Sequence, residues 1–122
     1  MPHARRRLGD RGEKLELQYL IEHGYVVLAT NYACREGEID VVCRDGDTLA
    51  FVEVKTRRGS LFGTPEEAVT PVKIAHVASA AAKYMAERGM ESCPWRIDVV
   101  AVALGPAGYL EDIRLIRGAG EW

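Results

Sequence analysis

Two segments rich in β-forming residues, EIDVVCR at 38–44 and TLAFVEVK at 48–55, flank the dipeptide Asp45-Gly46. Both residues of that dipeptide tolerate the positive φ angles of a type I′ turn, so Asp-Gly between two such segments is a strong signal for a β-hairpin. We therefore predict that the two segments form neighbouring antiparallel strands.

The register of this hairpin gathers several charged side chains. A two-residue turn pairs Asp40 with Phe51 and Glu38 with Glu53. Opposed residues share a face of the sheet, and so do residues two apart on one strand. We expect Asp40, Glu38, Glu53 and Lys55 on one side, and a four-residue turn would keep that arrangement. The other side is expected to carry the core residues Ile39, Val41, Val52 and Val54, which a slip by one residue would expose at high cost.

Two further segments have the pattern of helices. From about residue 8 to residue 23 apolar side chains recur on one stripe, and Gly24 is expected to end that helix. Thr70 and Pro71 supply an N-cap and a first-turn proline for a second helix, which is expected to run to about Arg88. Its predicted buried stripe consists of Ile74, Val77, Ala78, Ala81 and Met85.

Three more segments are predicted strands, at 25–30, 95–104 and 109–116. The segment 95–104 is nearly continuous in apolar residues, as in a central strand, whereas 109–116 has the pattern of an edge strand. Within the former, Asp98 can support a nearby site or pair with Arg96, and we favour the pairing. The order helix, three strands, helix, two strands predicts an α/β fold with a mixed central sheet flanked by helices.

The composition is that of one ordinary soluble domain. The chain has 122 residues, of which 48% are hydrophobic and 28% charged, and this suffices for a single core. No apolar run is long enough to cross a membrane, and no apolar segment follows the arginines of MPHARRRLGD, so a signal peptide is not expected. We expect a cytoplasmic protein in which residues 1–122 form one domain, with 1–7 as a flexible basic N-terminus and 117–122 as a flexible tail.

The spacing of the cysteines and histidines limits which metal ions the chain is expected to bind. The three cysteines form no CxxC pair and the three histidines are scattered, which fits reduced thiols and does not predict zinc. Metal ligands would then be carboxylates, which favour Mg²⁺ or Mn²⁺. The net charge of −2 does not indicate a nucleic-acid binder. Basic residues nevertheless cluster at 5–7 with Arg11, where surface charge is the simpler interpretation, and again at 55–58.

The charged face of the hairpin has two interpretations. It can be a solvated sheet face with a salt bridge, or it can be half of a metal site. Carboxylates on one patch repel each other and Lys55 offsets only one of them, whereas a divalent cation held by Asp40 and Glu53 would offset the rest. Lys55 could then position or help to deprotonate a nucleophile. Glu13, on the inward side of the first helix, could close the site or could be an acid favoured by the helix dipole.

Asp40 on one strand and Glu53-Val54-Lys55 on the next resemble the PD-(D/E)xK signature of restriction-endonuclease-like nucleases. The usual proline before the aspartate is replaced by Ile39.

Glu13 followed by the hairpin is similar to archaeal Holliday-junction resolvases. A closer resemblance, to a second family, extends over roughly residues 8–104. The segments GDRGEKLELQYL, NYACREGEIDVV, FVEVKTRR and RIDVVAV, with the stretch 63–73, resemble the YraN-like family of small bacterial proteins. Glu16 stands where that family tends to have a small residue, and the ending GAGEW does not resemble the family's usual tail.

The resemblance implies a restriction-endonuclease-like αβββαβ core and an Mg²⁺-dependent phosphodiesterase. It assigns the metal ion, Mg²⁺ or Mn²⁺, to Asp40, Glu53 and the carbonyl of Val54. It assigns Lys55 to orienting the attacking water and Glu13 to completing the site. In-line attack on phosphorus is the chemistry that suits such a site.

Basic residues near this site are candidates for contacts with nucleic acid. Arg57 and Arg58 follow the catalytic strand and are expected to contact the phosphate backbone. Lys73 matches a basic position of the family, although an exposed helix lysine is an equal interpretation, and Arg11 is a further candidate. Glu38 is an accessory candidate or a surface charge. The loop 59–71 is interpreted as a flap over the substrate or as an ordinary connection.

Three hypotheses follow for function. The first is a metal-dependent endonuclease that acts on DNA rather than RNA, including branched or structured DNA. This enzyme would have no membrane partner and would act as a homodimer. The second is a non-catalytic nucleic-acid-binding or assembly protein on the same fold, because fold does not imply function. The third is a structural protein with a salt-bridged sheet face, which leaves Glu13, Asp40 and Glu38 without a role.

Overall fold

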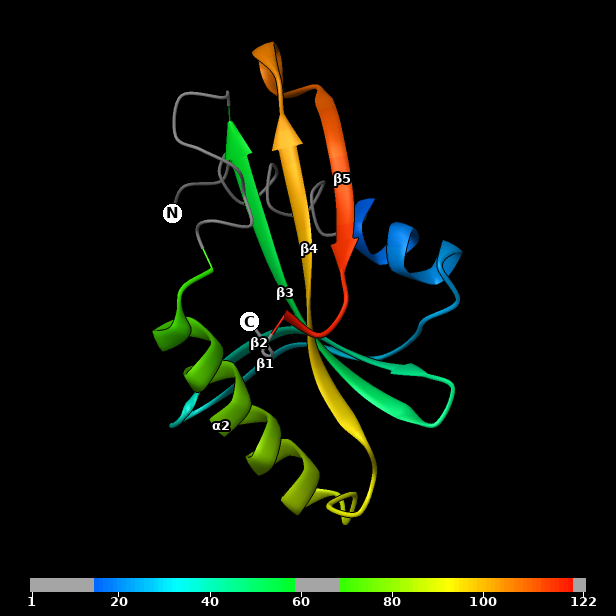
Figure 1. Ribbon diagram of the computed structural model, residues 1–122, viewed down its shortest axis with the longest axis vertical. Helices are drawn as coiled ribbons and strands as arrows, with labels where there is room; N and C mark the ends of the chain where they lie inside the picture. The colour runs from blue at the N-terminus through cyan, green and yellow to red at the C-terminus, as the bar shows by residue number, and fades with distance from the viewer. Residues whose placement is uncertain (1–14, 59–68, 120–122) are drawn as a thin grey trace.

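The computed structural model describes residues 15–58 and 69–119, which form a five-stranded sheet with a helix packed on each face (Figure 1). Residues 15–22 are helical and precede strands β1 (Val26–Cys34), β2 (Gly37–Asp45) and β3 (Thr48–Arg58). Helix α2 (Pro71–Glu87) leads to β4 (Trp95–Leu104), a 3₁₀ turn (Pro106–Gly108) and β5 (Leu110–Ile116). The predicted order of elements is thereby confirmed. In the described part of the chain, no helix combines the length and apolar character that membrane crossing requires.

The sheet is mixed, with its strands in the order β1-β2-β3-β4-β5. β3 and β4 are parallel and α2 connects them, whereas the other neighbouring pairs are antiparallel. A parallel pair needs such a crossover, and a helix usually provides it. The result is a mixed α/β fold consistent with a restriction-endonuclease-like core, as the sequence predicted.

The β2–β3 hairpin forms, but its turn lies one residue later than predicted. Asp45 pairs with Thr48, so Gly46 and Asp47 are the turn residues. Gly46 has a φ of 62°, and Asp47 is not among the described non-glycine residues with positive φ. This is the φ pattern of a type II′ turn, not of the expected type I′ turn. The partner of each paired residue therefore moves by two positions, which preserves the predicted face of Val41, Val52 and Val54.

Core residues of the central strands are buried on both faces of the sheet. On the α2 side, Phe51 and Val42 pack against a cluster that includes Val77 and Tyr84. On the side of helix 15–22, Leu20 packs with a cluster containing Val41, Val52 and Val100, and Val54 is partly buried against it.

Ile39 departs from the predicted alternation. It is fully buried, but it belongs to the cluster on the α2 side and not to the cluster of Val41 and Val52. The β2–β3 ladder ends at the pair Val41–Val52, so β2 separates from β3 immediately before Ile39. The expectation that Ile39 shares the face of the valines was wrong, because alternation across a hairpin holds only while the strands remain paired.

Helix α2 begins and ends where the sequence predicted. The Thr70 side chain accepts a hydrogen bond from the backbone N–H of Lys73 at 3.2 Å, Pro71 opens the first turn, and Gly89 has a φ of 65° beyond the C-cap Arg88. The buried residues are Val77, Ala80, Ala81, Tyr84 and Met85.

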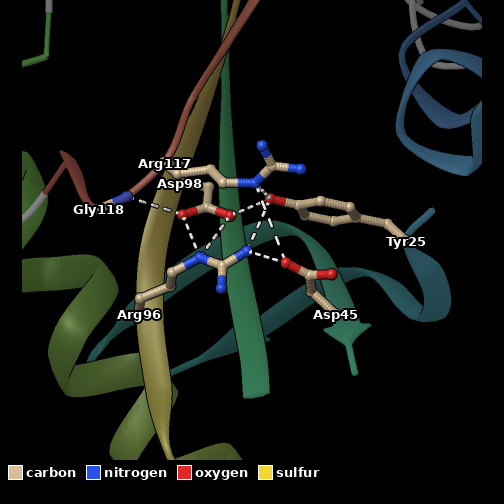
Figure 2. A network of polar contacts seen from close by, with 6 residues as sticks. All are labelled: Tyr25, Asp45, Arg96, Asp98, Arg117 and Gly118. Carbon is tan, nitrogen blue, oxygen red and sulfur yellow. Dashed lines mark hydrogen bonds and ion pairs between the residues drawn. The ribbon is translucent and has the colours of Figure 1, made fainter. Parts of the chain in front are cut away.

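A polar network ties the C-terminal segment to the sheet (Figure 2). The Asp98 carboxylate is fully buried and accepts hydrogen bonds from the Tyr25 hydroxyl at 2.5 Å, Arg96 Nε at 2.9 Å and the Gly118 N–H at 2.9 Å. Arg117 Nε donates to the Tyr25 hydroxyl at 3.1 Å. The predicted pairing of Asp98 with Arg96 is confirmed.

Other contacts extend this anchoring. Arg96 also donates to Asp45 at 2.7 Å, which joins β4 to the end of β2. Ala119 is buried against Val69 and Val99. Residues 117–119, expected to belong to a flexible tail, therefore contact three parts of the fold, and residues 120–122 lie outside the described range.

Candidate active site

The candidate site lies where β2 and β3 separate. Beyond the pair Val41–Val52, the Asp40 side chain takes the place of a backbone partner: its Oδ2 accepts a hydrogen bond from the N–H of Val54 at 2.7 Å. This bond holds the Asp40 carboxylate beside the strand segment that carries Glu53. The two acids expected to share one face are therefore neighbours at one fork in the sheet, but Asp40 lines a cavity on the side of helix 15–22, whereas Glu53 contacts Lys73 of α2.

Glu53 is a buried carboxylate with two cationic neighbours. The residue is 3% exposed, and its Oε1 lies 3.6 Å from Lys55 Nζ and 3.5 Å from Lys73 Nζ. Burial raises the pKa of Glu53, and the nearby charge of Asp40 raises that pKa further, while the two ammonium groups act in the opposite direction. The net effect is a pKa above the ordinary value, so the site favours added positive charge.

A cavity of about 240 Å³ adjoins Asp40 on the side of helix 15–22. Helix 15–22 and strands β1, β2 and β3 supply its walls, which consist of Glu16, Leu17, Thr30, Asn31, Asp40, Val41, Val54 and Thr56. Asn31 has a φ of 52°, in the left-handed region that asparagine adopts more readily than most residues other than glycine.

Glu16 lines this cavity, and the sequence interpretation noted it only as a departure from a family pattern. It is 5% exposed and lines the cavity together with Asp40. The signal was present in the sequence, since Glu16 lies four residues before the buried Leu20 and therefore on the same helix face.

The other predicted residues are placed as follows. Arg57 and Arg58 lie at the end of β3, beside Ala103 and Leu104 of β4, and Arg58 is exposed. Glu38 pairs with Ala33 of β1 and is exposed, so the structure does not place it opposite Glu53 as expected. Two causes separate Glu38 from Glu53: the hairpin register is shifted by two positions, and the β2–β3 ladder ends at Val41–Val52.

Some predictions fall outside the described residues. Glu13, expected to complete the site, and Arg11, expected to contact nucleic acid, both precede residue 15. Most of the predicted flap, residues 59–68, is likewise outside the described range. Its last residues are described: Val69 is buried and Thr70 caps α2.

The described donors suit a hard divalent cation. Asp40, Glu53 and the Val54 carbonyl supply oxygen atoms, and Mg²⁺ is commonly held by one or two carboxylates with water and substrate phosphate completing the shell. Within residues 15–58 and 69–119, no group of three His, Cys, Asp or Glu side chains is gathered closely enough to hold a metal ion. The burial of Glu53 beside the charge of Asp40 supports a cation at this position, because neighbouring carboxylates repel each other.

Comparison with known proteins identifies the family. Residues 12–102 match the family described as "Uncharacterised protein family UPF0102". A UPF0102 protein of Symbiobacterium thermophilum is 48% identical over 93% of this chain and 96% of its own length. A second, from Syntrophus aciditrophicus, is 45% identical over 94% of this chain and 89% of its own length. The resemblance to YraN-like proteins is confirmed, and the chain belongs to family UPF0102.

Proposed function

We propose that this protein is a metal-dependent endonuclease that hydrolyses phosphodiester bonds of DNA, using Mg²⁺ or Mn²⁺. The observation that carries the proposal is the arrangement at the fork of β2 and β3. There Asp40 is fixed on the N–H of Val54, and the buried Glu53 has a raised pKa with Lys55 beside it. The restriction-endonuclease-like topology supports the same proposal as an analogy of fold.

In this proposal the residues have separate roles. Asp40, Glu53 and the Val54 carbonyl would hold the cation, which when bound stabilises charge on a phosphate and its leaving oxygen. The Lys55 ammonium would donate a hydrogen bond to the attacking water or to a phosphate oxygen, because it lies two residues after Glu53 on the same face. The Asp40–Val54 hydrogen bond would keep the carboxylate in place before substrate arrives.

One observation favours a second candidate function. Two ammonium groups, of Lys55 and Lys73, already contact Glu53 at 3.6 and 3.5 Å. These contacts offset part of the charge that a cation would otherwise neutralise. A non-catalytic nucleic-acid-binding or assembly protein on the same fold would retain this arrangement without metal.

A homodimer is part of the proposal. A domain of 122 residues with a net charge of −2 offers little basic surface for gripping a duplex alone. Sedimentation equilibrium at micromolar concentration is expected to give twice the monomer mass, and a monomer at all concentrations would contradict this part.

The test is a cleavage assay on linear duplex, single-stranded and four-way-junction DNA, with a matching RNA strand. We expect Mg²⁺- or Mn²⁺-dependent cleavage of at least one DNA substrate that is lost with chelator and in the variant Lys55→Met. The variant Arg44→Ala, at an exposed position near the hairpin turn, serves as the matched control and is expected to retain activity. DNA binding without cleavage would support the second function instead.

A further inference from the structure

The last part of β3 has a strand on one side only. The last β3 residue that pairs with β2 is Val52, whereas the pairing with β4 continues to Arg58. In Figure 1, β4 runs beside this part of β3, while β1 and β2 lie beside the other half of the strand. Within residues 15–58 and 69–119, one edge of β3 beyond Val52 therefore has no neighbouring strand.

The hydrogen bonds of β3 show which of its backbone groups point to this open edge. The N–H of Val54 donates to Asp40 on the β2 side, whereas the N–H of Leu49 donates to Pro94, immediately before β4. Backbone groups of successive residues in a strand point alternately to its two sides. The N–H groups of Thr56 and Arg58 therefore point to the same side as that of Val54, away from β4.

Cationic side chains lie on both faces of the sheet beside this edge. Lys55 contacts Glu53 on the face of α2, and Arg57 shares that face by alternation. Thr56 lines the cavity on the side of helix 15–22, and Arg58 shares this second face. Thr56 and Arg58 are both exposed, and the segment VKTRR at 54–58 contains no acidic residue. Such an edge suits a phosphate group, which accepts hydrogen bonds from backbone N–H groups and is attracted by these cations.

A peptide strand is the other ligand that commonly binds an open sheet edge. It would need a row of free donors and acceptors, but the Val54 N–H is already bonded to Asp40. Only Thr56 and Arg58 then offer outward N–H groups before β3 ends. This short row with its positive charge favours a phosphate backbone over an added strand.

We propose that the backbone N–H of Thr56 donates a hydrogen bond to a phosphate of the DNA substrate, and that the bound strand follows the open edge of β3 from the fork towards Arg58. This inference rests on the proposed function and deepens it, since it assigns the path of the substrate. Thr56 is about 6.6 Å beyond Val54 along the strand. Its phosphate would therefore be next to the one at the proposed cation site, where the cation offsets the charge of Asp40.

The test removes the N–H without removing a charge. Thr56→Pro has no N–H at this position, and proline is tolerated at a sheet edge because no ladder hydrogen bond is lost. Thr56→Val is the matched control, which keeps the N–H and the β-branched shape but lacks the hydroxyl. Affinity for fluorescent single-stranded and duplex DNA is measured by anisotropy in Ca²⁺, which prefers oxygen ligands as Mg²⁺ does. Thr56→Pro is expected to weaken binding about tenfold, the effect of one lost hydrogen bond to a charged group, and Thr56→Val to bind as the wild type does.

The salt dependence of binding separates an uncharged contact from a charged one. Thr56→Pro is expected to leave the slope of log K against log salt unchanged, because the amide carries no charge. Arg58→Ala is expected to reduce that slope by about 0.7 for single-stranded and about 0.9 for duplex DNA, the effect of one lost cationic contact. Arg44→Ala, at an exposed position near the hairpin turn, should change neither affinity nor slope.

A second modification keeps the test decisive if proline disturbs the fold. The melting temperature of Thr56→Pro is compared with that of Thr56→Val. If the proline variant is much less stable, the amide of residue 56 is replaced by an ester through protein semisynthesis, which removes the N–H and keeps the threonine side chain. The ester protein is expected to show the same tenfold loss of affinity with an unchanged slope.

The outcomes distinguish this inference from the function on which it rests. If the wild type binds DNA and a folded protein without the N–H binds it equally well, the contact at Thr56 is wrong and the proposed function stands. If Thr56→Val loses as much affinity as Thr56→Pro, the hydroxyl makes the contact and the assignment to the N–H is overturned. If the wild type binds no DNA in Ca²⁺, both proposals are overturned.

Discussion

The carboxylate of Asp40 accepts a hydrogen bond from the backbone N–H of Val54 across the fork between β2 and β3, with 2.7 Å between Oδ2 and nitrogen. One side chain thus continues the strand pairing past the last ladder pair, Val41–Val52. It also fixes a negative charge near Glu53, whose pKa is raised by burial and then by Asp40. The local pairing of β2 with β3 and the proposed cation site therefore depend on the same hydrogen bond.

Replacing Asp40 should separate these two roles. Asp40→Asn can still accept the bond from Val54 through its amide oxygen, so its free energy of unfolding should stay within about 1 kcal/mol of the wild type. Asp40→Ala leaves the Val54 N–H without this acceptor and should lose about 1–3 kcal/mol. Urea unfolding measures both values, and equal losses in the two variants would contradict the structural role.

Lys73 should stabilise the ionised form of Glu53. In Lys73→Met the pKa of Glu53 is expected to rise further, because one of its two ammonium neighbours is lost. A carboxyl group whose pKa is raised in the folded state contributes stability that is fully present at pH values below its ordinary pKa of 4.5. That stability is lost as the pH rises through the raised pKa. That loss should be larger in the variant.

The cost of Lys73→Met at neutral pH should be about 1 kcal/mol, since Lys73 is partly exposed and Lys55 remains. It should disappear in acid, where Glu53 is protonated. Urea unfolding at both pH values measures the difference, and the background Glu53→Gln is the control in which it should vanish. A cost that does not change with pH would contradict the coupling.

How much of this could be predicted from the sequence depends on whether the interaction is local. The hairpin, the Thr70 cap of α2 and strand β4 follow from turn residues, capping residues and a continuous apolar run. The side chains of Val41 and Val52 lie on the predicted face because alternation holds along paired strands.

Features that depend on where strands separate or on distant segments were not predictable. The position of Ile39 results from the end of the β2–β3 ladder, which no local pattern indicates. The separation of Glu38 from Glu53 results from that end and from the shifted register of the hairpin. The contact of Lys73 with Glu53 requires the packing of α2 on the sheet. The anchoring of Gly118 on Asp98 joins residues 20 apart through tertiary structure.

The buried Asp98 should be among the most sensitive positions in the chain. Asp98→Ala removes the acceptor for Tyr25, Arg96 and the Gly118 N–H at once. Breaking a buried charged network of this kind costs about 3–5 kcal/mol, a large part of the stability of a small domain.

Asp112→Ala is the matched control for this prediction, because it breaks an exposed aspartate–arginine pair of similar length, 2.8 Å to Arg114. It should cost less than about 1 kcal/mol. Chemical unfolding of both variants gives the comparison, and a loss below 1 kcal/mol in Asp98→Ala would show that the network does not stabilise the fold.

Tyr25 should make the fold sensitive to alkaline pH. Burial, and then the hydrogen bond to Asp98, raise the pKa of Tyr25 from 10.0 to about 12. The stability that this shift represents is present below the ordinary pKa and is lost as pH rises through the raised one. The wild type should therefore lose more stability across this interval than Tyr25→Phe, which has no phenol to ionise. Unfolding curves at alkaline pH measure this, and equal losses would contradict a buried, hydrogen-bonded phenol.

The most direct test of the central claim is the thermal stability of the wild type, Asp40→Asn and Glu53→Gln over a titration with Mn²⁺ and Mg²⁺. A ligand that binds only the folded state raises stability by about 2.7 kcal/mol at a concentration 100 times its Kd. We predict a melting temperature that rises with metal concentration in the wild type and is insensitive to metal in both variants, while each variant remains folded. A melting temperature of the wild type that changes with neither metal would contradict a cation site at the fork of β2 and β3. So would variants whose melting temperature rises as much as that of the wild type.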